Sequence, residues 1–296
     1  MQTAHACRLC FERQIDVLVD VLAPEDTTEQ DRLREACLHA LGASSAASPP
    51  PEIAAQIYAV AAHCSGCPDP FAAHKKTANS KALAMLPELR ERVQCAEDPL
   101  AASLRFAVIA NYIDVGVAHT FDWEQALREE KSNEAFSAYP AWRTLLTQEA
   151  KEVLILGDNT GEIAIDSLLV QQLQALGHAV TYAVRGAPIL NDATLEDARF
   201  VGLDSLCRVI ETGVNSPGTL LHRCHPAFLE ELDQADLVLS KGQGNFEALH
   251  GQRGGVFFAF KVKCPVVATL TRLPEQTSVF IRSDPGGGFA EFQAAD

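Results

Sequence analysis

The sequence after Lys151 alternates short apolar runs with segments of helical spacing, and this alternation most constrains the fold. Val153-Leu154-Ile155-Leu156 predicts a buried strand, and residues 163–176 have apolar residues at helical spacing before Gly177. Predicted strands and helices then alternate at 179–184, 193–200, 208–210, 219–235 and 237–239, and apolar runs at 256–260 and 266–270 end the pattern. Such alternation predicts a three-layer α/β domain, with a parallel sheet covered by helices, over residues 149–284.

The two ends of the chain differ from this pattern. Residues 1–148 contain mostly segments of helical apolar spacing, such as Ile15, Leu18 and Leu22, and predict an N-terminal all-helical domain. The C-terminal segment 285–296 begins with a proline and three consecutive glycines, and we expect it to be a flexible tail.

Composition excludes several classes of protein. The 296 residues are 47% hydrophobic, which is enough for a sizeable core, and the net charge of −15 includes no basic face of the kind that binds nucleic acid. The N-terminus lacks the apolar region of a signal peptide, and no apolar run approaches the roughly 18 residues that span a membrane. Nine cysteines without a secretion signal indicate reduced thiols or metal ligands. We therefore expect a cytoplasmic protein that binds neither nucleic acid nor a membrane.

Polar side chains follow three of the predicted strands. Asp158 and Asn159 come after the first strand, Asp192 follows the second, and Lys241 precedes Gly242 and Gly244 after the strand at 237–239. If these strands are parallel, all three loops open at the same edge of the sheet, where ligands bind in such folds. Carboxylate and amide oxygens suit a hard cation, and a lysine beside glycine N–H groups suits an anion.

A structural interpretation of the same residues is also open. Asp158-Asn159 and Asn191-Asp192 are typical of turns and helix N-caps. The loop after Lys241 is neither a Walker loop nor a dinucleotide fingerprint, because its lysine precedes the glycines and the glycine spacing is wrong. The occurrence of three polar strand ends at one edge favours a cation and phosphate site over isolated caps.

The blocks around these strand ends resemble those of the DUF89 family, the damage-control phosphatases and their metal-binding relatives. The main blocks are 157–162, 184–194 and 240–247, and further similar blocks are Cys7-Arg8-Leu9-Cys10, Asp69-Pro70-Phe71 with Lys75 and Asn79, Asn111-Tyr112-Ile113-Asp114, 217–221 and 263–265. Their order matches the prokaryotic branch that contains a CxxC motif. The chain departs from the pattern at His63-Cys64-Ser65-Gly66-Cys67, at Ala110 and over 269–282.

The resemblance implies a Rossmann-like α/β domain after a helical part. It also implies one divalent metal, Mn, Co, Ni or Mg, bound by Asp158, Asn159 and Asp192. The activity it implies is hydrolysis of small phosphate monoesters, such as sugar phosphates or damaged phospho-metabolites. By position in the motifs, Lys241 would contact the phosphate, and Asn111 and Asp114 would line the same cleft.

We expect water to be the nucleophile, because the chain has no Asp-x-Asp-x-Thr motif for attack by a carboxylate. Asp114 and Glu162 are both candidates for the general base, and the sequence does not choose between them. The candidates to hold the organic part of the substrate are Asn111, Arg185, Ser216, Asn245 and Glu247.

Two further possibilities concern the cysteines and the type of function. Cys7/Cys10 and Cys64/Cys67 form two CxxC pairs, which could bind one structural zinc, act as redox pairs, or be inert thiols. The alternative functions are an S-adenosylmethionine-dependent carboxyl methyltransferase, an activity claimed for part of the family, and a non-catalytic binding protein held together by zinc.

Overall fold

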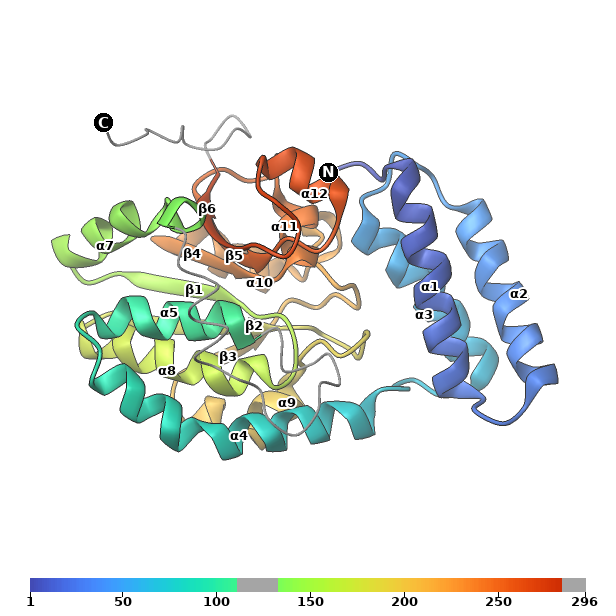
Figure 1. The fold of residues 1–296 in the computed structure, drawn as a ribbon, viewed down its shortest axis with the longest axis horizontal. Coiled ribbons are helices and arrows are strands. Elements are labelled where there is room, and N and C mark those ends of the chain that lie inside the picture. The colour runs from blue at the N-terminus through green and yellow to red at the C-terminus, as the bar shows by residue number, and fades with distance from the viewer. Residues whose placement is uncertain (111–132, 284–296) are drawn as a thin grey trace.

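The structure, a computed structural model, describes residues 1–110 and 133–283 (Figure 1). Its centre is a six-stranded sheet with the order β3-β2-β1-β4-β5-β6. The strands are β1 (Glu152–Leu156), β2 (Ala179–Val184), β3 (Arg208–Glu211), β4 (Leu237–Lys241), β5 (Val256–Lys261) and β6 (Ser278–Arg282). Strands β1 to β5 are parallel, as predicted, whereas β6 pairs antiparallel with β5 and was not predicted.

Helices surround this sheet and precede it in the chain. In the described residues they are α1 (His5–Leu22), α2 (Thr27–Ala43), α3 (Pro50–Ser65), α4 (Ala72–Gln94), α5 (Pro99–Ile109), α7 (Tyr139–Gln148), α8 (Glu162–Ala175), α9 (Leu195–Phe200), α10 (Pro226–Gln234), α11 (Gln243–Leu249) and α12 (Pro265–Thr271), with short 3-10 helices η2 (Asn133–Phe136), η3 (Leu203–Ser205) and η4 (Leu221–Arg223). The apolar run at 266–270 lies in α12, which begins at Pro265, a residue suited to a first helical turn.

The strand order contains a switch point between β1 and β4. The chain passes from β1 through α8 to β2 on one side, and it later returns through α10 to β4 on the other side of β1. Right-handed connections that run in opposite directions place their helices on opposite faces of the sheet. The loops after β1 and β4 therefore diverge, and ligands bind in the crevice that this divergence leaves.

The helices before β1 fall into two groups that pack differently. Helices α1, α2 and α3 share their own hydrophobic cluster, which includes Ile15, Leu33 and Ile57. Helices α5 and α7 bury residues in the core of the sheet, where the Trp142 ring lies 4.9 Å from that of Phe257. In Figure 1 the unit of α1–α3 stands opposite the carboxyl ends of the strands.

This packing differs from the predicted division at residue 148. The helical content before β1 is as predicted over the described residues, but only α1–α3 form a separate unit. Helix α5 is apolar on most of its surface and packs on α8 as well as the sheet, and α4 also packs on α8. These helices therefore belong to the α/β layers. The predicted tail at 285–296 lies outside the described residues.

Candidate active site at the carboxyl edge of the sheet

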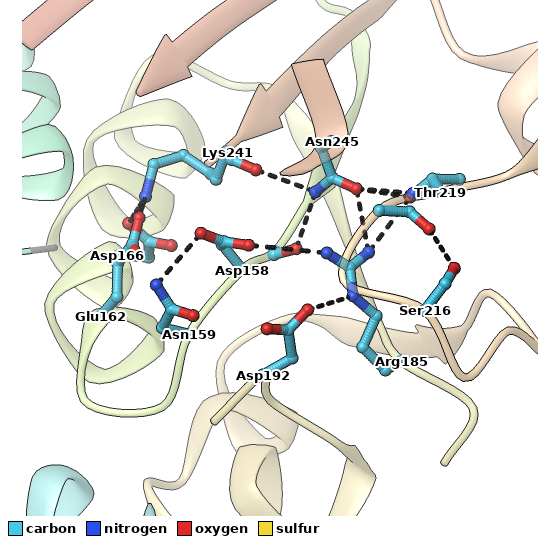
Figure 2. A network of polar contacts seen from close by, with 12 residues as sticks. Asp158, Asn159, Glu162, Asp166, Arg185, Asp192, Ser216, Thr219, Lys241 and Asn245 are labelled. Carbon is cyan, nitrogen blue, oxygen red and sulfur yellow. Dashed lines mark hydrogen bonds and ion pairs between the residues drawn. The ribbon is translucent and has the colours of Figure 1, made fainter. Parts of the chain in front are cut away.

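Asp158, Asn159 and Asp192 lie together on the floor of the switch point (Figure 2). Backbone hydrogen bonds join their two loops, since Thr160 N donates to Asn191 O at 2.9 Å and Ala193 N donates to Asp158 O at 2.8 Å. An isolated bridge pairs Asn159 with Asp192 directly. The structure thus brings together the three residues that the motifs predicted as metal ligands.

The charges on this floor are only partly compensated. Asp158 and Asp192 are 6% and 2% exposed. Arg185 Nε donates to Asp192 Oδ2 at 2.7 Å, but its Nη2 lies 3.5 Å from Asp158 Oδ1. Burial, with the nearby charges of Asp192 and Glu162, raises the pKa of Asp158 well above its ordinary value. A bound cation would relieve this cost.

The donor atoms of the floor suit a hard divalent cation. Asn159 Nδ2 donates to Asp158 Oδ2 at 3.1 Å, which leaves the Asn159 carbonyl oxygen as its ligating atom. Two carboxylates and an amide then offer the oxygen ligands that Mg²⁺ or Mn²⁺ prefers. The backbone of Gly242 closes the other side, because a Cβ there would lie 2.0 Å from Asp158 Oδ2. Only glycine at this position, with a φ of +81°, leaves room for the carboxylate.

Lys241 and Glu162 form a separate buried cluster beside this floor (Figure 2). Lys241 Nζ donates to Glu162 Oε1 and, at 2.8 Å, to Asp166 Oδ1. Tyr182 Oη donates to the other oxygen of Asp166 at 2.6 Å. The exposed fractions of Lys241, Glu162 and Asp166 are 0%, 2% and 0%. Burial would lower the pKa of Lys241, but the two carboxylates overcome this and raise the pKa above its usual range.

This arrangement corrects the predicted places of two residues. Lys241 was expected to face a phosphate and Glu162 to act as a general base, yet each side chain points to the other. The reason is the direction of the last residue of β4, whose side chain lies against α8 and meets carboxylates one helical turn apart. Sequence reasoning missed Asp166 and Tyr182, because their partners are distant in the chain.

Arg185, Ser216 and Asn245 hold the loops of the site together. Asn245 Nδ2 donates to Gly157 O at 3.0 Å and to Lys241 O at 2.8 Å, and its Oδ1 accepts from Arg185 Nη1 at 2.9 Å and from Thr219. Ser216 Oγ donates to Gly218 O at 2.5 Å. These three predicted substrate-binding residues are 1%, 0% and 0% exposed, in the order named. As placed, they position the floor and have no free surface for an organic group.

Residues of α4 form hydrogen bonds that hold the loop after β1. Gly161 N donates to Asn79 Oδ1 at 2.7 Å, and Asn79 Nδ2 donates to Asp197 at 3.1 Å. Lys75 is buried and pairs with Asp69 at 3.1 Å and with Asp197 at 3.0 Å. The motif block that contains these residues therefore fixes the start of α8 and of α9.

A cleft of about 510 Å³ opens over the floor, between α1 and α3 on one side and the sheet edge on the other. Asp158, Asn159 and Asp192 lie at its base, and Glu247 and Lys263 lie on its walls. Burial raises the pKa of Glu247 to about 7, although Gln243 donates to its carboxylate at 2.8 Å. The exposed Lys263 was not predicted as a site residue, although its block was noted in the sequence. Asn111 and Asp114 lie outside the described residues.

The two CxxC pairs do not meet. Cys7 and Cys10 line the cleft together with Cys264, whereas Cys64 and Cys67 do not. All nine cysteines are free. Within residues 1–110 and 133–283 no group of three or more His, Cys, Asp and Glu side chains is placed to hold a metal, so the four thiols do not form the tetrahedral site that zinc would need.

None of the helices in residues 1–110 and 133–283 combines the length and the hydropathy needed to cross a membrane.

A mostly parallel sheet with carboxylates at its switch point defines an α/β protein of the kind in which ligands bind at the strand ends. Residues 3–279 match the family model described as the damage-control phosphatase ARMT1-like domain, and the chain belongs to this family. The predicted resemblance to DUF89 proteins is thereby confirmed.

Individual relatives agree with this assignment. The chain is 27% identical to damage-control phosphatase PH1575 of Pyrococcus horikoshii, over 96% of this chain and 99% of that protein. It is 31% identical to a damage-control phosphatase of Archaeoglobus fulgidus over 69% of this chain and 72% of that protein. It is also 29% identical to the uncharacterized protein MJ0202 of Methanocaldococcus jannaschii, over 88% of this chain and 89% of that protein.

A solved structure supports the fold. The crystal structure of a DUF89 family protein, PH1575 of Pyrococcus horikoshii, matches with a TM-score of 0.86 and 26% identity, over 96% of this chain and 100% of that one. The names of the relatives support a phosphatase function for this chain.

Proposed function

We propose that the chain is a metal-dependent phosphomonoesterase of small metabolites, with one divalent cation held by Asp158, Asn159 and Asp192. The observation that supports this most is the pair of buried carboxylates at the base of a cleft. The positive charge near them does not offset their burial and mutual repulsion, because the pKa of Asp158 is raised. This oxygen donor set suits Mg and Mn, and the family resemblance adds Co and Ni as candidates. When bound, such a cation would act as a Lewis acid on a phosphoryl oxygen.

The chain itself supplies donors for the remaining phosphate oxygens. Lys263 lines the cleft and its charge opposes the upward shift in the pKa of Asp158, so it is near the floor. Asn191 also lines the cleft, and its Nδ2 is buried without a hydrogen-bond partner among the described residues. We assign to Lys263 and Asn191 the neutralisation of the phosphoryl group. Lys241 is fully buried in its pairs with Glu162 and Asp166 and does not line the cleft.

Proton transfer requires a group that is accessible from the cleft. Glu162 is paired with Lys241 and is 2% exposed, which does not suit a general base. Glu247 lines the cleft and has a pKa raised to about 7, chiefly by burial, which suits proton transfer near neutral pH. Glu247 is therefore our candidate to exchange a proton with the attacking water or the leaving group.

The test is hydrolysis of a chromogenic phosphate ester by protein treated with a chelator and then supplied with Mn, Co, Ni or Mg. We expect activity only with metal, and we expect Asp158→Ala to lower kcat by at least about 1000-fold. Asp31→Ala is the matched control, since the Asp31 side chain is 85% exposed on the helical unit. Full activity of Asp158→Ala would exclude the proposed site. Equilibrium binding of S-adenosylmethionine, without hydrolysis of the ester, would instead support the methyltransferase alternative.

A further inference from the structure

The four arginines of the α1–α3 unit differ in their surroundings. Arg8 pairs with Glu12 at 3.2 Å, Arg32 with Glu29 at 2.5 Å, and Arg34 with Asp16 at 3.0 Å. Arg13 is exposed on α1 and has no hydrogen bond or ion pair with any residue that the structure describes. In a chain with a net charge of −15, an unpaired guanidinium is available to an anion from solution.

Arg13 lines the same cleft as the proposed metal ligands, but at a different place from Lys263. Both side chains belong to the lining of the cavity of about 510 Å³. The charge of Lys263 acts on Asp158 at the floor. Arg13 belongs to α1 and therefore lies at the helical wall.

The cleft that both cations line also has apolar walls. Phe11, Pro51 and Ala54 line the cleft from the helical unit, and Leu190, Pro217 and Pro265 line it from the loops of the sheet. A ligand that fills the cleft would therefore have an anionic group at the floor, a small body against these side chains, and a second anionic group at Arg13.

We propose that Arg13 binds a second anionic group of the substrate, and that the cleft selects phosphate monoesters with a carboxylate or another phosphate remote from the reacting ester. This inference rests on the proposed function, because it takes the reacting phosphate to lie at the floor. A guanidinium forms paired hydrogen bonds with either kind of anionic group. Arg13 is thus a specificity-determining residue, separate from the groups that act on the phosphate.

Two pairs of probes test this with a matched difference in charge. 3-Phosphoglycerate and glycerol 3-phosphate differ by a carboxylate, and fructose 1,6-bisphosphate and fructose 6-phosphate differ by a phosphate. We expect Arg13→Gln to raise KM about tenfold for the member with the second anion, with kcat within about twofold. KM for the other member should stay unchanged. The pair with the larger effect identifies which anionic group Arg13 prefers.

Arg8→Gln is the control, because Arg8 lies on the same helix but is paired with Glu12 and is absent from the lining of the cleft. It should alter neither pair of probes. Arg13→Lys should give an intermediate KM, since it keeps the charge and loses the paired geometry. Equal effects of Arg13→Gln on both members of each pair, or no effect on any probe, would overturn the inference.

Calorimetric binding separates this inference from the proposed function. In metal-free protein we expect 3-phosphoglycerate to bind about tenfold more tightly than glycerol 3-phosphate, and Arg13→Gln to remove that difference. If no probe is hydrolysed with any metal, the phosphatase proposal fails while the binding measurement still decides the role of Arg13. Equal binding of the two probes by the unaltered protein would count against Arg13.

Discussion

Two groups of ionisable side chains lie at the same edge of the sheet and differ in how completely their charges are paired. In the buried cluster, Lys241 lies between Glu162 and Asp166, and Asp166 also accepts a hydrogen bond from Tyr182. On the floor of the cleft, Asp158 has Arg185 only at 3.5 Å and has Asp192 and Glu162 as like charges. Both groups are almost fully buried.

The difference shows how to separate a structural ionic cluster from a reactive one when the residue types are the same. A buried charge that is fully paired with opposite charges and hydrogen bonds gains little from binding a further ion. A buried carboxylate pair with incomplete compensation lowers its energy further by binding a cation. Residue type and position in a motif therefore place a residue near the chemistry, whereas pairing decides whether it takes part.

The largest expected effect is that of Lys241→Met on stability. The substitution leaves Glu162 and Asp166 buried together without their cation, which should reduce the free energy of unfolding by about 3–5 kcal/mol. Urea unfolding of the metal-free protein measures this. A variant that keeps its stability and loses only catalysis would place Lys241 at the phosphate, as the motifs first predicted.

Lys263→Met is the matched change on the cleft wall and should give the opposite pattern. Because Lys263 is exposed, its loss should alter the free energy of unfolding by less than about 0.5 kcal/mol. Removing its charge from the phosphoryl group should lower kcat/KM by about 10- to 100-fold. Steady-state kinetics beside the same urea titration test both parts, and unchanged kinetics would remove Lys263 from the site.

Asp158→Asn should stabilise the metal-free protein. The pKa of Asp158 is raised in the folded state by burial, Asp192 and Glu162, so this carboxyl opposes folding increasingly as the pH rises from its ordinary pKa to the raised one. Asparagine resembles the protonated form, and we expect a gain of about 1–3 kcal/mol at pH 8 that disappears toward pH 4.

Unfolding curves at both pH values measure this gain. Added Mn at pH 8 should make the parent protein more stable than Asp158→Asn, because a metal stabilises the folded protein that binds it. A variant less stable than the parent at pH 8 without metal would show that Asp158 is already well compensated.

Much of the fold follows from local patterns. The apolar run 153–156 and the helical spacing of 163–176 predicted β1 and α8 within a residue or two, and the alternation predicted a parallel sheet. The antiparallel strand β6 was not predicted, because it is a short edge strand and no further helix and strand follow it to continue the alternating pattern. The helices before β1 were predicted as helices, but their packing on the sheet or on one another depends on distant surfaces.

The candidate site followed the same division. Asp158, Asn159 and Asp192 were predicted to lie together because they follow strands that local patterns identify, and the structure places them side by side. The burial of Arg185 and Asn245 was not predictable, because it depends on loops that come together from β1, β2 and β4. Arg13 showed no local signal, and Lys263 stood only in the similar block 263–265, since each is an ordinary exposed cation until the cleft is known.

The sequence alone determined most of the order of strands and helices and the polar strand ends, because each depends on residues adjacent in the chain. The tertiary structure decided which charged groups face the cleft and which face one another. Lys241 illustrates the reason, because the direction of one side chain at the end of β4 depends on where α8 packs. Charge compensation is a property of the space around a group, and distant segments fill that space only in the folded chain.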